Sequence, residues 1–158
     1  DTAWRRRVVR GAVHDEGAAM MGGVSGHAGL FATAGDMAAI MSMLMDEGEY
    51  RGRRLIGRET VRLFTSQAFD GNRRGLVFDK PLLDASLNGT PSPRASRASF
   101  GHSGYTGTFA WADPERGLIF VFLCNRTFPS RSTMLSALNV RTQIHDIFYS
   151  GDLLEDQP

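Results

Sequence analysis

The fold of this chain is decided by the stretch Ser99-Phe-Gly-His-Ser-Gly-Tyr-Thr-Gly-Thr-Phe-Ala-Trp-Ala-Asp-Pro-Glu-Arg-Gly-Leu-Ile-Phe-Val-Phe-Leu123. A turn from Asp113 to Gly117 separates two apolar runs, at about 106–112 and 118–124. Its proline suits a type I turn, and Gly117 tolerates the left-handed conformation that the turn needs. The second run is continuously apolar, as in a central strand covered on both faces. The sequence therefore predicts an antiparallel hairpin.

The bulk composition is that of an ordinary globular chain. It has 158 residues, 42% of them hydrophobic and 22% charged, with a net charge of +1. Such a balance gives no electrostatic case for binding nucleic acid or a membrane surface. No stretch reaches the roughly 18 to 20 apolar residues of a membrane span. The single cysteine, Cys124, lies in an apolar run and is predicted to be a small buried hydrophobe, with no disulfide framework.

Three helices are predicted. Thr33 and Asp36 resemble a capping box, and the apolar positions that follow have helical spacing up to a stop at Gly48. The methionines widen this stripe, so we expect the helix to be buried on most sides. A second, short helix is expected near 58–66, with Val61 and Phe64 facing inward. A last helix at about 132–149 would bury a stripe formed by Leu135, Leu138, Ile144, Ile147 and Phe148.

The other segments read as follows. Residues 1–30 are rich in glycine and look like an ordered loop system that needs another surface to lie on. Residues 76–78 are a short strand candidate. Residues 80–98 combine proline, serine and Asn88-Gly89 and are predicted to be a mobile surface loop. The expected fold is α+β, with residues 1–158 forming a single partial domain in which helices pack on an antiparallel sheet.

Glycines surround the tripeptide His102-Ser103-Gly104, at positions 101, 104 and 107. Glycines let a ligand approach the backbone closely, and exposed N–H groups at a strand edge can bind an oxyanion. Both His102 and Ser103 could donate hydrogen bonds to a substrate carboxylate or carbonyl. The alternative is that the glycines merely shape a strand and its bend, with His102 an ordinary surface residue. The spacing does not decide between the two.

Two further clusters carry weaker signals. His14-Asp15-Glu16 together with His27 contains ordinary metal ligands, but no spacing matches a ligand template. Hydrogen bonding within a loop is therefore favoured over a metal site, and no metal or other cofactor is predicted. Ser25, two residues before His27, lacks the Gly-x-Ser-x-Gly pattern of a nucleophile elbow and is expected to be a turn residue.

Several motifs together resemble the C-terminal half of a serine β-lactamase-like hydrolase. They are Gly22-Gly-Val-Ser-Gly-His-Ala-Gly-Leu-Phe-Ala-Thr-Ala-Gly-Asp36, Asn72-Arg-Arg-Gly-Leu76, Phe100-Gly-His-Ser-Gly-Tyr-Thr-Gly-Thr108, Asp113-Pro114 and Asn125-Arg126. The family includes class C β-lactamases, D-alanyl-D-alanine peptidases and related esterases. The resemblance covers nearly the whole chain and is specific as a set. It implies the C-terminal part of the β-lactamase/DD-peptidase fold.

By this resemblance, His102-Ser103-Gly104 matches the third of the family's three site motifs. His102, Ser103 and Gly104 would bind substrate, and the backbone N–H of Tyr105 would be an oxyanion-hole donor. The Ser-x-x-Lys motif is not in this chain, because the only lysine, Lys80, has Val77 three residues before it. We therefore expect the nucleophile to lie in an N-terminal half of the same domain.

The implied activity is acyl transfer on an amide or ester, with a small-molecule or cell-wall-derived substrate. A narrower resemblance rests on His14-Asp15-Glu16 and on the Pro/Ser insertion before Phe100. It points to a variant fused behind a family 3 β-N-acetylglucosaminidase. The second hypothesis is accordingly a non-catalytic binding or interaction domain attached to such a glycosidase. The family resemblance alone favours a periplasmic or secreted location.

Overall fold

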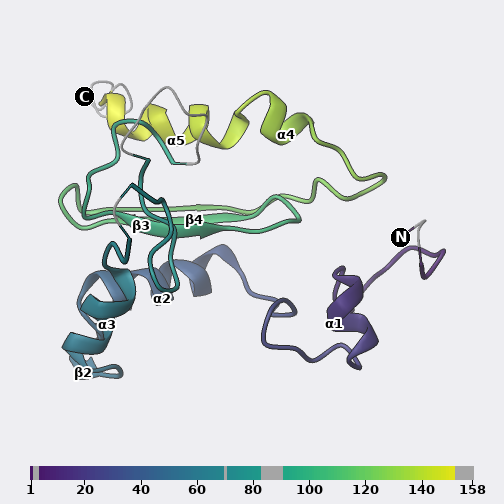
Figure 1. Ribbon diagram of the computed structural model, residues 1–158, viewed down its shortest axis with the longest axis horizontal. Coiled ribbons are helices and arrows are strands. Elements are labelled where there is room, and N and C mark those ends of the chain that lie inside the picture. Colours follow the sequence, from purple (N-terminus) through teal and green to yellow (C-terminus); the bar gives the residue numbers. More distant parts are fainter. Residues whose placement is uncertain (2–3, 70, 83–90, 152–158) are drawn as a thin grey trace.

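The computed structural model describes residues 1, 4–69, 71–82 and 91–151. Helices flank a small antiparallel sheet in an α+β arrangement, as expected for the C-terminal portion of the β-lactamase fold (Figure 1). The sheet lies in the middle, with α5 (Val140–Ser150) over one face and α2 (Ala34–Met45) under the other. None of the described helices is long and apolar enough to cross a membrane.

The sheet forms around the predicted hairpin. Strands β3 (Phe100–Ser103), β4 (Phe109–Asp113) and β5 (Leu118–Phe122) are antiparallel and lie in the order β3-β4-β5. Gly117 has φ of +62°, so the turn uses the left-handed residue that the sequence supplies. The first run becomes a strand three residues later than predicted, because the chain turns at 104–107 before it joins β4.

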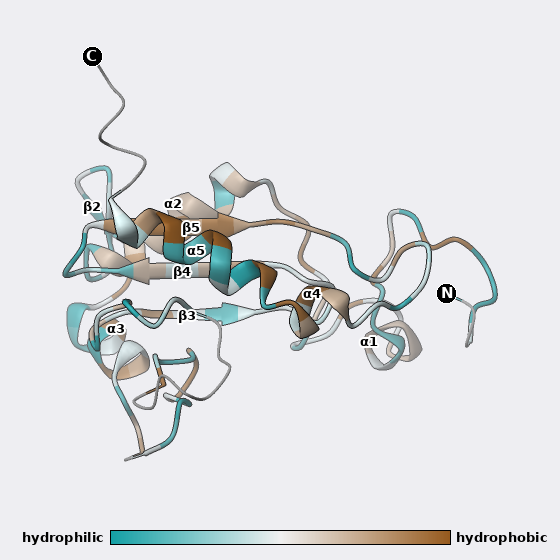
Figure 2. Cartoon of the chain, turned by 90° about the horizontal axis from the view of Figure 1, so that it is seen from above, coloured by the Kyte–Doolittle hydropathy of each residue, from teal (hydrophilic) through white to brown (hydrophobic). Residues whose placement is uncertain are grey.

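Alternation along the strands divides the core into two layers. On the α2 face, Met41 packs against Phe100 and Ala112. On the α5 face, Phe109, Trp111 and Phe120 form a second cluster, and all three rings are buried. Figure 2 shows the apolar colouring concentrated in β5. Burying a large apolar side chain contributes about 1.5 to 3 kcal/mol, so both helices are held mainly by these layers.

The continuously apolar run of β5 was expected in a central strand. In the described sheet β4 is central and β5 is at the edge. Its side chains still alternate between the two layers, with Ile119 toward α2 and Phe120 toward α5. Helices cover both faces of this strand, which explains the apolar pattern. An apolar sequence shows that both faces of a strand are covered. It does not show whether the strand has one hydrogen-bonded neighbour or two.

The capping box of α2 is confirmed. The Asp36 N–H donates to Thr33 Oγ1 at 3.2 Å, and the Thr33 N–H donates to the Asp36 carboxylate at 3.0 Å. These contacts satisfy N–H groups that the first turn leaves without partners. The expected burial on most sides is wrong for the described chain. Met41 is buried, whereas Ile40 is 46% exposed, because α2 presents only one face to the sheet.

A short hairpin of β1 (Glu49–Tyr50) and β2 (Arg53–Arg54) leads from α2 to helix α3 (Arg58–Thr65). The predicted helix at 58–66 therefore forms. Val61 faces inward as expected, but Phe64 is 40% exposed. The predicted strand at 76–78 does not form. The chain instead makes a tight turn there, closed by a 2.8 Å bond from the Gly75 N–H to the Phe78 carbonyl.

The last predicted helix is broken in two. Helix α4 (Met134–Ala137) ends at Leu138, and Asn139, with φ of +50°, reorients the chain before α5. The predicted stripe is only partly buried. Leu138, Ile147 and Phe148 are about half exposed, although the Phe148 ring still contacts Phe120. Ile144 packs against the same cluster, beside the fully buried His145.

Among the described residues of the segment 1–30, the chain forms the expected loops plus one short helix, α1 (Glu16–Met20), capped by Asp15. Cys124 is only half-buried. Within the predicted loop at 80–98, residues 83–90 lie outside the described part of the chain. Ser92 and Ser96, which are described, bond to Asp146 and Asp113 respectively. Whether the loop is mobile stays a prediction.

Candidate functional site

The tripeptide His102-Ser103-Gly104 lies at the end of β3, where the sheet edge opens. The N–H of Gly104 bonds to the Thr108 carbonyl and so faces β4. In an antiparallel strand, successive residues direct their backbone groups to opposite sides. Gly101 accordingly faces outward, where it exchanges two hydrogen bonds with Asp79. Ser103, which is in phase with Gly101, directs its backbone groups to the open edge, whereas Tyr105 lies in the turn at 104–107 that follows the strand.

The backbone N–H of Tyr105 meets no hydrogen-bond acceptor among the described residues. Its carbonyl is held by the Arg126 Nε–H at 2.5 Å, and the Arg126 guanidinium lies 4.2 Å from the centre of the Tyr105 ring. The Arg126 N–H also bonds to Thr106 O at 2.8 Å. Arg126 therefore holds the carbonyl groups of two successive residues, Tyr105 and Thr106, in the turn that also carries the Tyr105 N–H. An oxyanion hole requires donors that are held in place in advance.

Gly107 makes the turn after Tyr105 possible. Its φ is +111°, and a Cβ there would lie 2.4 Å from Cys124 Sγ. Gly101 is constrained in another way, because a Cβ there would lie 2.2 Å from the Ala110 carbonyl oxygen. Gly107 is thus required by the conformation of the loop, and Gly101 is required by the close pairing of β3 with β4. Part of the glycine pattern thus has the purely structural explanation that the sequence left open.

His102 is exposed, and both of its ring nitrogens are engaged. Nδ1 lies 2.8 Å from the Ser103 carbonyl, and Nε2 lies 3.1 Å from Arg74 Nη1. A carbonyl can only accept and a guanidinium can only donate. The two contacts fit the tautomer in which Nδ1 carries the proton and Nε2 accepts from Arg74. A substrate that bonded directly to a His102 nitrogen would have to replace one of these partners.

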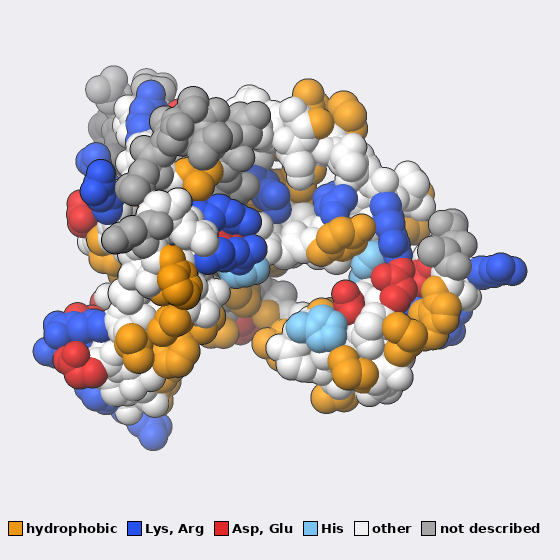
Figure 3. All heavy atoms as spheres, viewed as in Figure 1, with side chains coloured by type: hydrophobic (Ala, Val, Ile, Leu, Met, Phe, Trp, Pro, Cys, Tyr) orange, Lys and Arg blue, Asp and Glu red, His pale blue; other side chains and the backbone are white. Residues whose placement is uncertain are grey.

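A basic group lies beside His102, around a buried carboxylate. Asp79 is 2% exposed and pairs with Arg73 and with Arg74, each at 2.6 Å. Only the Arg73 contact has hydrogen-bond alignment, so the Arg74 contact is an ion pair. Figure 3 shows basic side chains gathered around a carboxylate and a histidine, beside the hollow in this face of the molecule.

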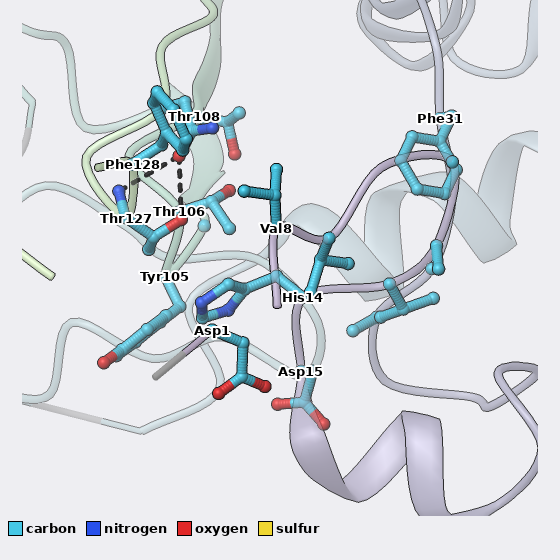
Figure 4. A pocket seen from close by; sticks show the side chains of 18 of the residues that line it. Asp1, Val8, His14, Asp15, Phe31, Tyr105, Thr106, Thr108, Thr127 and Phe128 are labelled. Atoms are coloured by element: carbon cyan, nitrogen blue, oxygen red, sulfur yellow. Dashed lines mark hydrogen bonds between the residues drawn. The ribbon is translucent and has the colours of Figure 1, made fainter. Parts of the chain in front are cut away.

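A cavity of about 1000 Å³ opens beyond Tyr105, between this loop and the N-terminal segment. Figure 4 shows His14 and Tyr105 side by side on its wall, with Thr106 and Thr108 above them in this view. The two rings stack with their centres 5.9 Å apart. Burial and the nearby Arg131 lower the pKa of His14, which favours the uncharged ring. Arg131 also pairs with Glu16 and so ties the N-terminal segment to the 126–132 loop.

The second cluster is a set of loop hydrogen bonds. His27 Nδ1 lies 2.6 Å from Ser25 Oγ, and its Nε2 lies 3.1 Å from the Asp15 carboxylate. Asp15 also caps α1 by accepting from the Ala18 N–H. In the nucleophilic triad the serine bonds to Nε2 and the carboxylate to Nδ1. This order is reversed here, and no group of three metal-ligating side chains exists among the described residues.

Comparisons with known proteins identify the family of the chain. The family model described as Beta-lactamase matches residues 1–142, so the chain belongs to the β-lactamase family of serine hydrolases. A relative from Escherichia coli K12, named "Putative D-alanyl-D-alanine carboxypeptidase", is 38% identical over 123 residues. Relatives of the same name from Escherichia coli O157:H7 and Salmonella typhi are each 39% identical, over 117 and 123 residues.

These alignments cover 77%, 73% and 77% of this chain, but only 28%, 27% and 28% of the three relatives. The chain therefore spans little more than a quarter of the length of the proteins that it resembles.

Sequence reasoning did not single out Arg74, Asp79 or Arg126 as site residues. Arg74 and Arg126 stood inside the motifs that carried the family resemblance, but nothing in their spacing indicated their partners. Asp79 is buried and charged, which is rare without a specific partner. Its burial is visible only after folding, because the local sequence predicts only that Asp79 lies between a short strand and a surface loop.

Proposed function

We propose that this chain forms one wall of an acyl-transfer site in a serine hydrolase that acts on an amide or ester. The observation that carries the proposal is the open edge of β3. There Ser103 faces outward beside His102, and the following turn carries the Tyr105 N–H, which has no acceptor among the described residues, in a chain of the β-lactamase family. In this reading His102, Ser103 and Gly104 contact the substrate. The Tyr105 N–H stabilises the charge that develops on the carbonyl oxygen.

The nucleophile belongs to an N-terminal half of the same domain. The sequence of this chain contains no Ser-x-x-Lys, so it cannot supply the acylated serine by the family's motif. The relatives' extra length leaves room for that half. Their printed names favour a cell-wall peptide as substrate. The reaction needs no metal or organic cofactor, because a serine and an oxyanion hole suffice for acyl transfer.

The alternative is a non-catalytic binding or interaction domain attached to a family 3 β-N-acetylglucosaminidase. No contact in the described structure favours it over catalysis. It rests on the resemblance of His14-Asp15-Glu16 and the Pro/Ser insertion to such fusions. A full-length reading frame without Ser-x-x-Lys would favour this alternative.

Covalent labelling tests the proposal. A fluorescent penicillin should label the full-length protein on a serine outside residues 1–158 and should leave this chain alone unlabelled. Turnover of nitrocefin and of a p-nitrophenyl ester should follow the same pattern, because removing the nucleophile costs several orders of magnitude in rate. Stoichiometric labelling of a serine within this chain would sink the proposal. An unlabelled, inactive full-length protein would support the binding domain.

A further inference from the structure

The turn that carries Arg74 is attached to the strand that carries His102. The Asp79 N–H donates to the Gly101 carbonyl at 2.8 Å, and the Gly101 N–H donates back to the Asp79 carbonyl at 3.1 Å. The isolated bridge between Arg74 and Asp79 closes the turn on itself. Main-chain hydrogen bonds to Gly101, one residue before His102, therefore place the backbone of Arg74 relative to β3.

The side chain of Arg74 is held from the other end by charge. The Asp79 carboxylate is 3% exposed, and a buried carboxylate without a cation would be strongly unfavourable. It therefore retains the guanidinium of Arg74 at 2.6 Å, which leaves the same nitrogen, Nη1, 3.1 Å from His102 Nε2. The other guanidinium nitrogens, Nη2 and Nε, have no partner among the described residues, and the side chain is 47% exposed.

Arg73 provides an internal comparison. It pairs with the same carboxylate at 2.6 Å, through the other oxygen, and its side chain is 40% exposed. It makes no contact with His102 in the described structure. The two arginines thus share one anchor and similar exposure, and only Arg74 reaches the imidazole.

We propose that Arg74 is the positioning residue of His102. Its guanidinium holds the imidazole in the neutral form that carries its proton on Nδ1. The remaining N–H groups of Arg74 are the groups that can donate hydrogen bonds to a substrate at this point of the site wall. The Nδ1–H is then committed to the Ser103 carbonyl at 2.8 Å, which fixes the ring against the strand. The consequence for catalysis rests on the proposed function, but the protonation state of the ring does not.

Nitrogen NMR tests the geometry directly. The full-length protein is labelled with ¹⁵N in histidine only, and His102 is assigned by the loss of its signals in His102→Gln. At neutral pH, long-range proton–nitrogen correlations should show Nδ1 protonated and Nε2 unprotonated. Arg74→Ala should introduce the form protonated on Nε2, whereas Arg73→Ala should leave the His102 signals unchanged. A wild-type His102 protonated on Nε2, or equal changes in the two alanine variants, would overturn the proposal.

Kinetics of the active full-length enzyme test the consequence. Arg74→Ala should lower kcat/KM about tenfold, and Arg73→Ala less than threefold, with equal losses of melting temperature because each removes one ion pair to Asp79. The double variant Arg74→Ala/His102→Ala should be no slower than the worse single variant, because residues that act as one unit are not additive. Full additivity would overturn the proposal. An inactive full-length protein would contradict the proposed function, while the NMR result would still decide the role of Arg74.

Discussion

The hydroxyl of Tyr149 donates a 2.8 Å hydrogen bond to the buried carboxylate of Asp113, which ties helix α5 to the end of β4. The same carboxylate accepts from the Ser96 N–H at 2.8 Å and from the Ser96 hydroxyl at 2.6 Å. The sequence indicates Asp113 as the first residue of a turn and as part of the family motif Asp113-Pro114, but not its partners. In the fold it joins the sheet, the last helix and the loop before β3.

Asp113→Ala should destabilise the protein by about 3 kcal/mol, because it leaves several buried donors without an acceptor. Burial opposes the charged form, but the hydrogen bonds from Ser96 and Tyr149 outweigh it and lower the pKa of Asp113. A lowered carboxyl pKa gives stability that is present above about pH 4 and is lost as the pH falls through the native pKa. Urea unfolding at pH 7 and pH 3 measures both effects. The exposed Asp46→Asn is the control and should change neither.

His145 should make the protein less stable as the pH falls from about 6.5 toward 4. Its ring is fully buried and stacks on Phe120 with centres 4.6 Å apart. Burial lowers its pKa to about 4. The unfolded chain therefore takes up a proton in this range before the folded one does, which costs roughly 3 kcal/mol of stability by pH 4.

The variant His145→Phe removes that titration. Among the described residues His145 Nε2 is buried without a hydrogen-bond partner, so the phenyl ring also removes an unsatisfied polar atom. Unfolding free energies of His145→Phe should vary less between pH 4 and 6.5 than those of the wild type or of the exposed control His27→Gln. An unchanged pH dependence in His145→Phe would contradict the assignment.

Gly101→Ala should detach β3 from the sheet. A Cβ would lie 2.2 Å from the Ala110 carbonyl oxygen and 2.4 Å from the Trp111 ring, and neither can move without disrupting β4 or the core. We expect a loss of several kcal/mol, in the range of severe overpacking. Gly26→Ala is the matched control, because a Cβ there meets nothing within 4 Å. Equal melting temperatures for the two variants would refute the close approach at β3.

His102→Ala in the full-length enzyme should lower catalytic efficiency and leave stability nearly unchanged. The ring is exposed, so its loss leaves little cavity. Its bonding in the site wall corresponds to about 1.5 to 3 kcal/mol, or roughly ten- to a hundredfold in kcat/KM. Thermal melting and steady-state kinetics on one preparation separate a site residue from a structural one. A large fall in melting temperature with normal activity per folded molecule would rule out the site assignment.

Limited trypsin digestion should cut first after Arg94 or Arg97, within the loop predicted to be mobile. Both residues are exposed, but Ser92 and Ser96 anchor their neighbours to α5 and β4. Cleavage there requires these anchors to open, so Ser92→Ala should accelerate it. Mass spectrometry of the early products identifies the site. First cleavage inside residues 118–124 would contradict the prediction.

The candidate site could be predicted from sequence only along the strand. His102, Ser103, Gly104 and Tyr105 are contiguous, so their order fixes which of them share an edge once a strand forms. Arg74 lies 28 residues before His102 in the chain, and Arg126 lies 21 residues after Tyr105. Contacts at such separations depend on how turns and strands pair, which no local pattern records.

By itself the sequence determined the hairpin around Asp113–Gly117, the capped start of α2 and the α+β class, because turn chemistry, capping and apolar periodicity act over a few residues. Only the tertiary structure decided that Asn139 breaks the last helix and that His145, which the predicted stripe did not include, is the buried residue of α5. It also decided that Asp79 holds Arg74 against His102. These features depend on burial and on long-range pairing, because a side chain's environment is set by segments distant in the chain.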